Sequence, residues 1–182
     1  MAVIINADTS DGLKLTSDTS GLLQFQNNGT VLGMVQQVVS TTKTDAFTTT
    51  STSFTDLTGM SVSITPSSTS NKILITGMVV GSHSSSVFSL YNLVRGSTNI
   101  MQSTGGSSLN CSFFHDNESF GDFDRGLTYM PINFLDSPSS TSSTTYKLQI
   151  RTNSGTVFVN RRGLNDAIIA VSTITAMEVV AW

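Results

Sequence analysis

One short segment gathers several of the side chains that could bind a metal ion. Between His115 and Asp124 the sequence gathers one of its two histidines and four of its twelve acidic residues. The four carboxylates belong to Asp116, Glu118, Asp122 and Asp124. Because Ca²⁺ prefers oxygen ligands such as carboxylates, an irregular calcium site is one interpretation of this segment. An EF-hand is excluded, since Phe120 and Leu127 stand where that loop needs an oxygen ligand and a glutamate.

An exposed loop that contacts a partner is the alternative for the same segment, and we favour it. Aromatic side chains are interleaved with the acids and would anchor such a loop. They are Phe113, Phe114, Phe120 and Phe123. We therefore expect no bound metal and keep the four carboxylates as weak calcium candidates.

The second histidine, His83, lies among serines in the segment Gly81–Ser86. A histidine next to a serine can act as the base that activates a nucleophile in hydrolases. In a chain this rich in serine such a neighbour is expected by chance, and the common hydrolase, nucleotide-binding and metalloprotease motifs are missing. We expect no catalytic residue and no cofactor, and a hydrolase is only a distant alternative.

The composition excludes several classes of protein. Of the 182 residues only 12% are charged, the net charge is -3, and Ser and Thr supply 55 residues. Hydroxyl side chains suit β-strands, turns and surfaces between subunits. A nucleic-acid-binding protein needs a basic stripe that displaces counterions, so we expect no nucleic-acid partner. The length fits one domain with an appendage.

Alternating residues predict the centre of the fold. Residues 60–65 alternate between apolar and hydroxyl side chains, which predicts a half-buried strand. The next strand, residues 72–80, carries apolar residues on both faces. One face has Ile73, Ile75 and Val79, and the other has Leu74, Met78 and Val80. Such a strand needs cover on both sides, so we predict two packed sheets, a subunit interface that includes Leu74, Met78 and Val80, or both.

Short strands separated by Ser, Thr, Gly and Asn turns continue over the rest of the chain, and we find no convincing helix. The predicted strands are 36–42, 46–50, 53–57, 60–65, 72–83, 87–95, 99–102, 110–114, 127–135, 145–152, 157–160 and 170–180. This spacing predicts an all-β fold, an antiparallel jelly-roll-like β-sandwich. The turn 153–155 predicts a hairpin between the strands before and after it.

The last predicted strand, residues 170–180, is mostly apolar on both faces, so we expect it in the interior of a sheet. Glu178 is the exception in this strand. An unpaired buried charge is very costly, so we predict a salt bridge between Glu178 and Lys147 or Arg151. The partner lies in the same subunit or in a neighbour, and we count Glu178 among the interface residues.

Residues 1–35 differ from residues 36–182, and we predict an N-terminal attachment arm followed by a β-sandwich head domain. A unit of turn plus strand at Asp8–Leu15 is repeated at Asp18–Phe25. Two copies are too few for a solenoid and cannot build a core alone, so the arm needs a partner. The predicted attachment residues are Ile4, Leu13, Leu15, Leu22, Leu23 and Phe25.

The single cysteine, Cys111, permits no intrachain disulfide, which fits a reducing folding compartment. The N-terminus lacks the basic region and apolar run of a signal peptide. No stretch approaches the roughly 20 apolar residues of a membrane span, so we expect no membrane insertion. If the protein leaves a cell, we expect a route such as lysis.

Several segments resemble virion structural proteins of tailed bacteriophages, especially short fibre-like proteins of phages that infect aquatic bacteria. These segments are Gln37–Thr44, Phe54–Pro66, Lys72–Ile75, Phe134–Pro138, Thr144–Ile150 and Ser172–Val179. The resemblance covers most of residues 36–182, and the repeat in the arm is similar to attachment segments of fibre-like proteins. It implies a non-enzymatic building block of the virion, made in the host cytoplasm and released by lysis.

The resemblance also implies a homotrimer whose jelly-roll-like head is comparable to the tumour necrosis factor-like fold. The arm would bind other virion proteins, either of the tail or baseplate or the major capsid protein. We favour a short tail fibre whose loops meet a host glycan or protein. The expected host-facing residues are His83, Ser85, His115, Asn117 and Phe120. The alternative is a capsid decoration (cement) protein whose arm staples coat subunits together.

Overall fold

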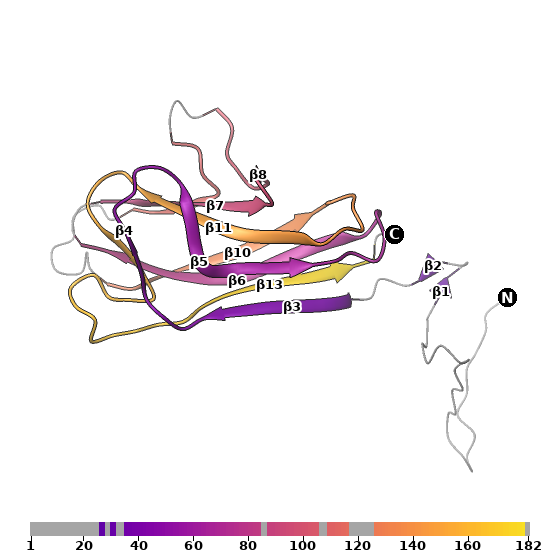
Figure 1. Cartoon of the computed structure of the whole chain (residues 1–182), viewed down its shortest axis with the longest axis horizontal. Helices are drawn as coiled ribbons and strands as arrows, with labels where there is room; N and C mark the ends of the chain where they lie inside the picture. Colours follow the sequence, from indigo (N-terminus) through magenta and orange to yellow (C-terminus); the bar gives the residue numbers. More distant parts are fainter. Residues whose placement is uncertain are drawn as a thin grey trace, which may run out of the picture.

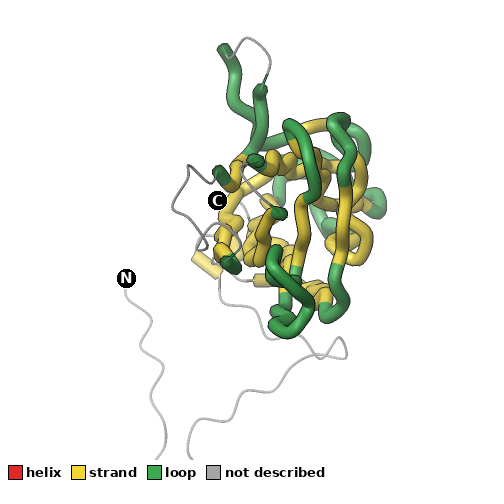
Figure 2. Tube along the Cα trace, turned by 90° about the vertical axis from the view of Figure 1, so that its left-hand side faces the viewer, coloured by secondary structure: helices red, strands yellow, loops and turns green. Residues whose placement is uncertain are grey.

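The computed structural model describes residues 26–27, 30–31, 35–84, 87–105, 109–116 and 126–180. Within these ranges the chain forms strands, turns and irregular segments, and it contains no helix, hence none that could span a membrane (Figure 2). The first two strands, β1 (Gln26–Asn27) and β2 (Thr30–Val31), are short and pair only with each other, antiparallel. The other strands form two sheets.

The first sheet is built around β6, whose position is central because strands pair along both of its edges. Its members are β3 (Val35–Lys43), β4 (Phe47–Thr49), β6 (Lys72–His83), β10 (Thr128–Asp136), β12 (Val157–Val159) and β13 (Ser172–Val179). β10 pairs with one edge of β6, while β13 and β12 pair one after the other along the opposite edge. β3 pairs with the outer edge of β13, and β4 pairs with the outer edge of β12. The first sheet is therefore four strands wide.

The second sheet has the same plan. Its members are β5 (Thr55–Ile64), β7 (Ser89–Arg95), β8 (Thr98–Asn99), β9 (Phe113–His115) and β11 (Thr144–Thr152). β11 lies between β5 and β7, and β9 and β8 share the free edge of β7. Three pairs of strands each share one position in a sheet, namely β3 with β4, β8 with β9, and β12 with β13, so the chain has eight strand positions. Numbered along the chain, the first sheet has the order first, eighth, third, sixth, and the second sheet has the order second, seventh, fourth, fifth. This is the strand order of a jelly roll, which confirms the predicted fold class.

The core lies between the two sheets, where strands present every second side chain inward. The first sheet contributes Ile73, Ile75, Val79, Met130, Ile132, Val157, Val159, Ile174 and Ala176. The second contributes Leu57, Met60, Val62, Ile64, Tyr91, Leu93, Tyr146, Leu148 and Ile150. Gly77 in β6 allows β13 to approach, because a Cβ at this position would lie only 2.2 Å from the Thr173 carbonyl oxygen.

Two sequence predictions about the strands are wrong. Residues 53–57 and 60–65 are not separate strands, because β5 runs through the region with a bulge at Gly59, whose φ is +83°. The predicted hairpin around residues 153–155 does not form. β11 belongs to the second sheet and β12 to the first, so this turn carries the chain from one sheet to the other. The local turn sequence does not encode that difference.

Candidate functional site

The two ends of the sandwich carry different groups of side chains. β6 begins at Lys72 and ends at His83. Val179 of β13 pairs with Lys72 and also with Val35 of β3, so these three residues lie at the same end of the sandwich. β3 therefore begins at the Lys72 end, and because the predicted arm precedes β3 in the chain, we name this end the arm end (Figure 1). The opposite end, at His83, is the distal end. At a strand rise of about 3.3 Å, the twelve residues of β6 separate the two ends by roughly 36 Å.

A pair of stacked imidazole rings marks the distal end. The rings of His83 and His115 lie with centroids 4.0 Å apart and planes tilted by 32°. His83 is fully buried and His115 is 8% exposed. Burial first, and then the nearby His83, lower the pKa of His115 to about 4, although Asp116 opposes the shift. His115 is therefore neutral at physiological pH.

The prediction that His83 and His115 are exposed loop residues is wrong. Both lie within strands, and their side chains point into the protein. The sequence held a signal for His83, because it has the same parity in β6 as the core residues Ile73, Ile75 and Val79. Ser85, Asn117 and Phe120 lie outside the described residues, so their host-facing role stays a prediction.

An apolar cavity of about 270 Å³ lies on the outer side of the second sheet, towards the distal end. Its described lining consists of Phe88, Leu90, Leu109, Cys111, Phe114 and Asp116. Phe114 and Leu109 leave 60% and 46% of their surface exposed, so the cavity opens to solvent beside large apolar groups. Cys111 is buried, and burial raises the pKa of its thiol. Asp116 supplies the one charge among these lining residues.

The calcium candidates are only partly covered by the structure. Asp116 is exposed at the end of β9, while Glu118, Asp122 and Asp124 lie outside the described residues. Within the described ranges no three His, Cys, Asp or Glu side chains gather into a metal site. The irregular calcium site stays a prediction.

Glu178 occupies the arm end and is fully buried. Its Oε1 accepts hydrogen bonds from the Ser67 backbone N–H at 2.7 Å and from Asn71 Nδ2 at 2.6 Å, and its Oε2 accepts one from Gln37 Nε2 at 2.6 Å. The Ser67 hydroxyl donates a further bond at 2.7 Å. Burial alone would raise the pKa of this carboxyl, but the donors of Asn71, Gln37 and Ser67 outweigh it and lower the pKa below 4.5.

The predicted salt bridge of Glu178 is wrong, because neutral donors surround its carboxylate. Lys147 instead pairs with Asp56 at 2.7 Å, and the Arg151 guanidinium lies 5.6 Å from the centre of the Phe54 ring. Both cations lie on the outer face of the second sheet, whereas Glu178 points inward from the first. The carboxylate is also inaccessible, so Glu178 is not an interface residue.

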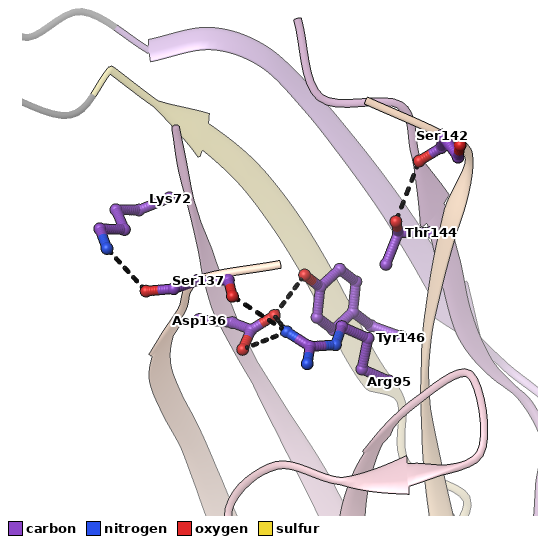
Figure 3. A network of polar contacts seen from close by, with 7 residues as sticks. All are labelled: Lys72, Arg95, Asp136, Ser137, Ser142, Thr144 and Tyr146. Atoms are coloured by element: carbon purple, nitrogen blue, oxygen red, sulfur yellow. Dashed lines mark hydrogen bonds and ion pairs between the residues drawn. The ribbon is translucent and has the colours of Figure 1, made fainter. Parts of the chain in front are cut away.

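A second polar network joins the sheets at the arm end and was missed by the sequence reasoning. Arg95 Nη1 donates to both carboxylate oxygens of Asp136 at 2.9 and 2.8 Å, and the Tyr146 hydroxyl donates to Asp136 Oδ2 at 2.7 Å (Figure 3). Lys72 Nζ donates to the neighbouring Ser137 hydroxyl at 2.7 Å. A signal existed, because Asp136 has the parity of the core residues Met130 and Ile132.

The outer face of the first sheet carries aligned rows of side chains, which we name the open face. Its register places Val38, Met177, Leu74 and Leu135 in one row across all four strands. The next rows are Ser40, Thr175, Thr76 and Asn133, and then Thr42, Thr173, Met78 and Pro131. Leu74 and Met78 are partly exposed here, consistent with their predicted faces.

Val80, the third apolar residue of that face of β6, is fully buried within the chain. Phe158 lies on the same side of the sheet, and the Arg161 guanidinium stacks 4.6 Å from the centre of its ring. The Ser82 hydroxyl donates to the Arg161 carbonyl at 2.5 Å, so the segment 161–171 is anchored over this end of β6. The prediction that Val80 contacts another subunit is therefore wrong. The attachment residues Ile4, Leu13, Leu15, Leu22, Leu23 and Phe25 lie outside the described residues.

The fold is a jelly roll with eight strand positions in two sheets, with uncharged rows on the outer face of the first sheet and an apolar cavity on the outer side of the second. No protein family model and no curated protein matches the sequence. Among solved structures, the chain is similar to the VP2 subviral particle of infectious bursal disease virus, with 18% identity and a TM-score of 0.34 over 96% of this chain and 44% of that one. It is also similar to the structure of the Gx strain of that virus, with 14% identity and a TM-score of 0.37 over 95% of this chain and 45% of that one.

The chain thus spans less than half the length of the chains it matches. Because identities and TM-scores are low, we base the fold assignment on the strand order and draw no functional conclusion from these similarities.

Proposed function

We propose that this chain is a non-enzymatic structural protein of a bacteriophage virion, a homotrimeric short tail fibre whose head faces the host and whose N-terminal arm docks on the particle. One observation carries the proposal beyond the sequence resemblance. The chain enters the jelly roll at Val35 at the arm end, while the cavity beside Phe114 lies towards the distal end, and β6 spans roughly 36 Å between these two ends. A head that is held by its arm would present this cavity outward.

The cavity has the character of a contact site for a host glycan or protein. Its wall combines exposed aromatic and aliphatic surface with the Asp116 carboxylate, and such apolar pockets with few polar groups are typical of binding sites. An exposed Phe114 in a pocket wall is a suitable anchor, because binding energy concentrates on a few large side chains.

The histidines support a non-enzymatic role. A general base works best with a pKa near the operating pH, and a pKa of about 4 leaves His115 a poor base at neutral pH. His83 lies buried against it in a ring stack rather than open to a substrate.

Adsorption of the phage to its host tests the proposal. Purified protein that occupies the receptor should reduce adsorption, and Phe114→Asp should abolish this competition because it places a charge in the apolar cavity. Phe114 is 60% exposed, so the variant should still fold. Ser63→Lys, at an exposed position on the same sheet but outside the described cavity lining, is the matched control and should compete like the wild type.

The finding that neither the wild type nor the control binds host cells or reduces adsorption would contradict a host-facing head. A capsid decoration protein remains the alternative function, and hundreds of copies spread over the capsid, rather than tens at the tail, would favour it.

A further inference from the structure

The outer faces of the two sheets differ in charge. The second sheet exposes Lys147, which pairs with Asp56, and Arg151. The open face of the first sheet, with its twelve residues in three rows, contains no charged residue. The nearest charge on β6 is Lys72, beyond the end of the rows, where its ammonium binds the Ser137 hydroxyl. The three rows of the open face are thus uncharged, and the charged residues on this side of the sandwich, such as Lys72 and Arg161, lie beyond the ends of the rows.

Exposed apolar surface concentrates on the same side. The described residues include ten large apolar side chains that are exposed, and seven of these belong to the outer side of the first sheet or to the adjoining segment 161–171. They are Val38, Tyr129, Leu135, Leu164, Ile168, Ile169 and Val171. Val38 and Leu135, the two ends of the apolar row, are each 56% exposed. Exposed large apolar side chains that gather on one side of a protein mark contact sites.

We propose that further copies of the same chain cover the open face, which makes it the subunit interface of the oligomer. An uncharged face offers no partner for the charges of another protein, and burying unpaired charges against it would be costly. An equally uncharged surface fits it, and three copies that turn their open faces towards a common three-fold axis would offer such surfaces to one another. The apolar row of the open face, its polar row of hydroxyl and amide groups and its mixed third row can bury methyl groups and exchange hydrogen bonds with a like surface. This inference deepens the proposed homotrimer and rests on that proposal.

The size of the face agrees with this occupant. Four strands about 4.8 Å apart and three rows about 6.6 Å apart give a face of roughly 19 by 20 Å, or roughly 380 Å². A stable interface buries about 800 Å² per partner. The open face supplies about half of that area, and the exposed apolar residues of the segment 161–171 extend it.

Charge substitutions at the two most exposed apolar positions test the inference. Val38→Lys and Leu135→Lys, singly and together, should convert the full-length oligomer into monomers, with an increase of at least about tenfold in dissociation constant. Both side chains are 56% exposed in the single chain, so the variants should fold. Circular dichroism and thermal unfolding of the monomers verify this. Ser63→Lys on the other sheet is the matched control and should leave the oligomer intact.

Analytical ultracentrifugation measures the outcome. Monomeric Val38→Lys and Leu135→Lys proteins beside an oligomeric control support the interface. An oligomer that withstands both substitutions, or a wild type that is monomeric at the highest concentration measured, overturns it. This test is separate from the test of the proposed function. If the protein is found in virions but its oligomer withstands the substitutions, only the proposed interface is wrong. If the oligomer depends on the open face but the protein is absent from virions, only the proposed virion role is wrong.

Discussion

The Ser172 hydroxyl donates a hydrogen bond to Asn160 Oδ1 at 2.6 Å, and together these side chains bridge the break between β12 and β13. Ser172 Oγ also accepts from the Val80 backbone N–H at 3.0 Å. Asn160 Nδ2 donates to the carbonyl oxygens of Lys43 at 2.8 Å and Asp45 at 3.2 Å. The pair thus connects β6, the break between β12 and β13, and the connection between β3 and β4 at the point where the segment 161–171 leaves the sheet.

Asn160→Gly should lower the free energy of unfolding by about 2 to 4 kcal/mol, because several buried hydrogen bonds lose a partner. Asn160 has a φ of +59°, which glycine adopts without strain, so the loss reports on the side chain rather than on the backbone. Ser139→Gly is the control, since Ser139 has a φ of +51° but is exposed. Denaturant unfolding measures both, and a loss below about 1 kcal/mol for Asn160→Gly would refute the role of the bridge.

Glu178 should make stability depend on acid pH. Its pKa is lowered in the folded chain from 4.5, so its stabilising contribution is present above pH 4.5 and is lost as the pH falls through the folded pKa. Glu178→Gln should cost about 1 to 3 kcal/mol at pH 7, because the new amide group faces hydrogen-bond donors. The difference from the wild type should shrink below pH 4.5. A difference that stays constant down to acid unfolding would contradict the carboxylate network.

His115 should also lower the stability of the folded chain as the pH decreases, at higher pH values than Glu178 does. The unfolded chain binds a proton near pH 6.5, whereas folded His115 binds one only near pH 4, so stability decreases as the pH falls between these values. His115→Phe keeps a ring against His83 and removes this titration, so its pH profile should be flatter in that range. Nuclear magnetic resonance titration checks the cause directly. A folded His115 that titrates near 6.5 would show that the ring stack is open to water.

Tyr146→Phe should lower the free energy of unfolding by about 1 to 3 kcal/mol, because it removes a hydrogen bond to the charged Asp136 carboxylate. Burial, and then the bond to Asp136, raise the pKa of Tyr146 above its ordinary 10.0. Its contribution is therefore fully present below pH 10.0 and is lost as the pH rises towards the folded pKa. Tyr129→Phe, at a side chain that is 61% exposed, is the control and should change stability by less than about 0.5 kcal/mol. Equal losses in both variants would argue against the network.

Local alternation was sufficient to predict most strands. β6 has the predicted bounds of 72–83, and the faces predicted for Ile73 and Leu74 are those observed, because residue parity alone decides them. The interior position predicted for the last strand is also confirmed, since β13 lies between β3 and β6.

Contacts between distant segments could not be predicted in this way. The donors to Glu178 lie 107 residues or more away in sequence, so its neutral environment follows from the strand order rather than from its neighbours. Val80 is buried because the segment 161–171 leaves the sheet after Asn160 and folds back over this end of β6. The alternation of apolar and polar residues within a strand does not indicate that another segment covers it. The inward direction of His83, by contrast, was present in its parity.

Gold-labelled antibodies against the head, imaged on intact particles of the encoding virus, test the proposed function most directly. If the protein is a short tail fibre held by its N-terminal arm, the label should lie at the tail in a small, fixed number of copies. Deletion of residues 1–35 should remove the label from the particles while leaving the folded head in solution. Particles that carry no label, or that keep it without the arm, would contradict the proposal.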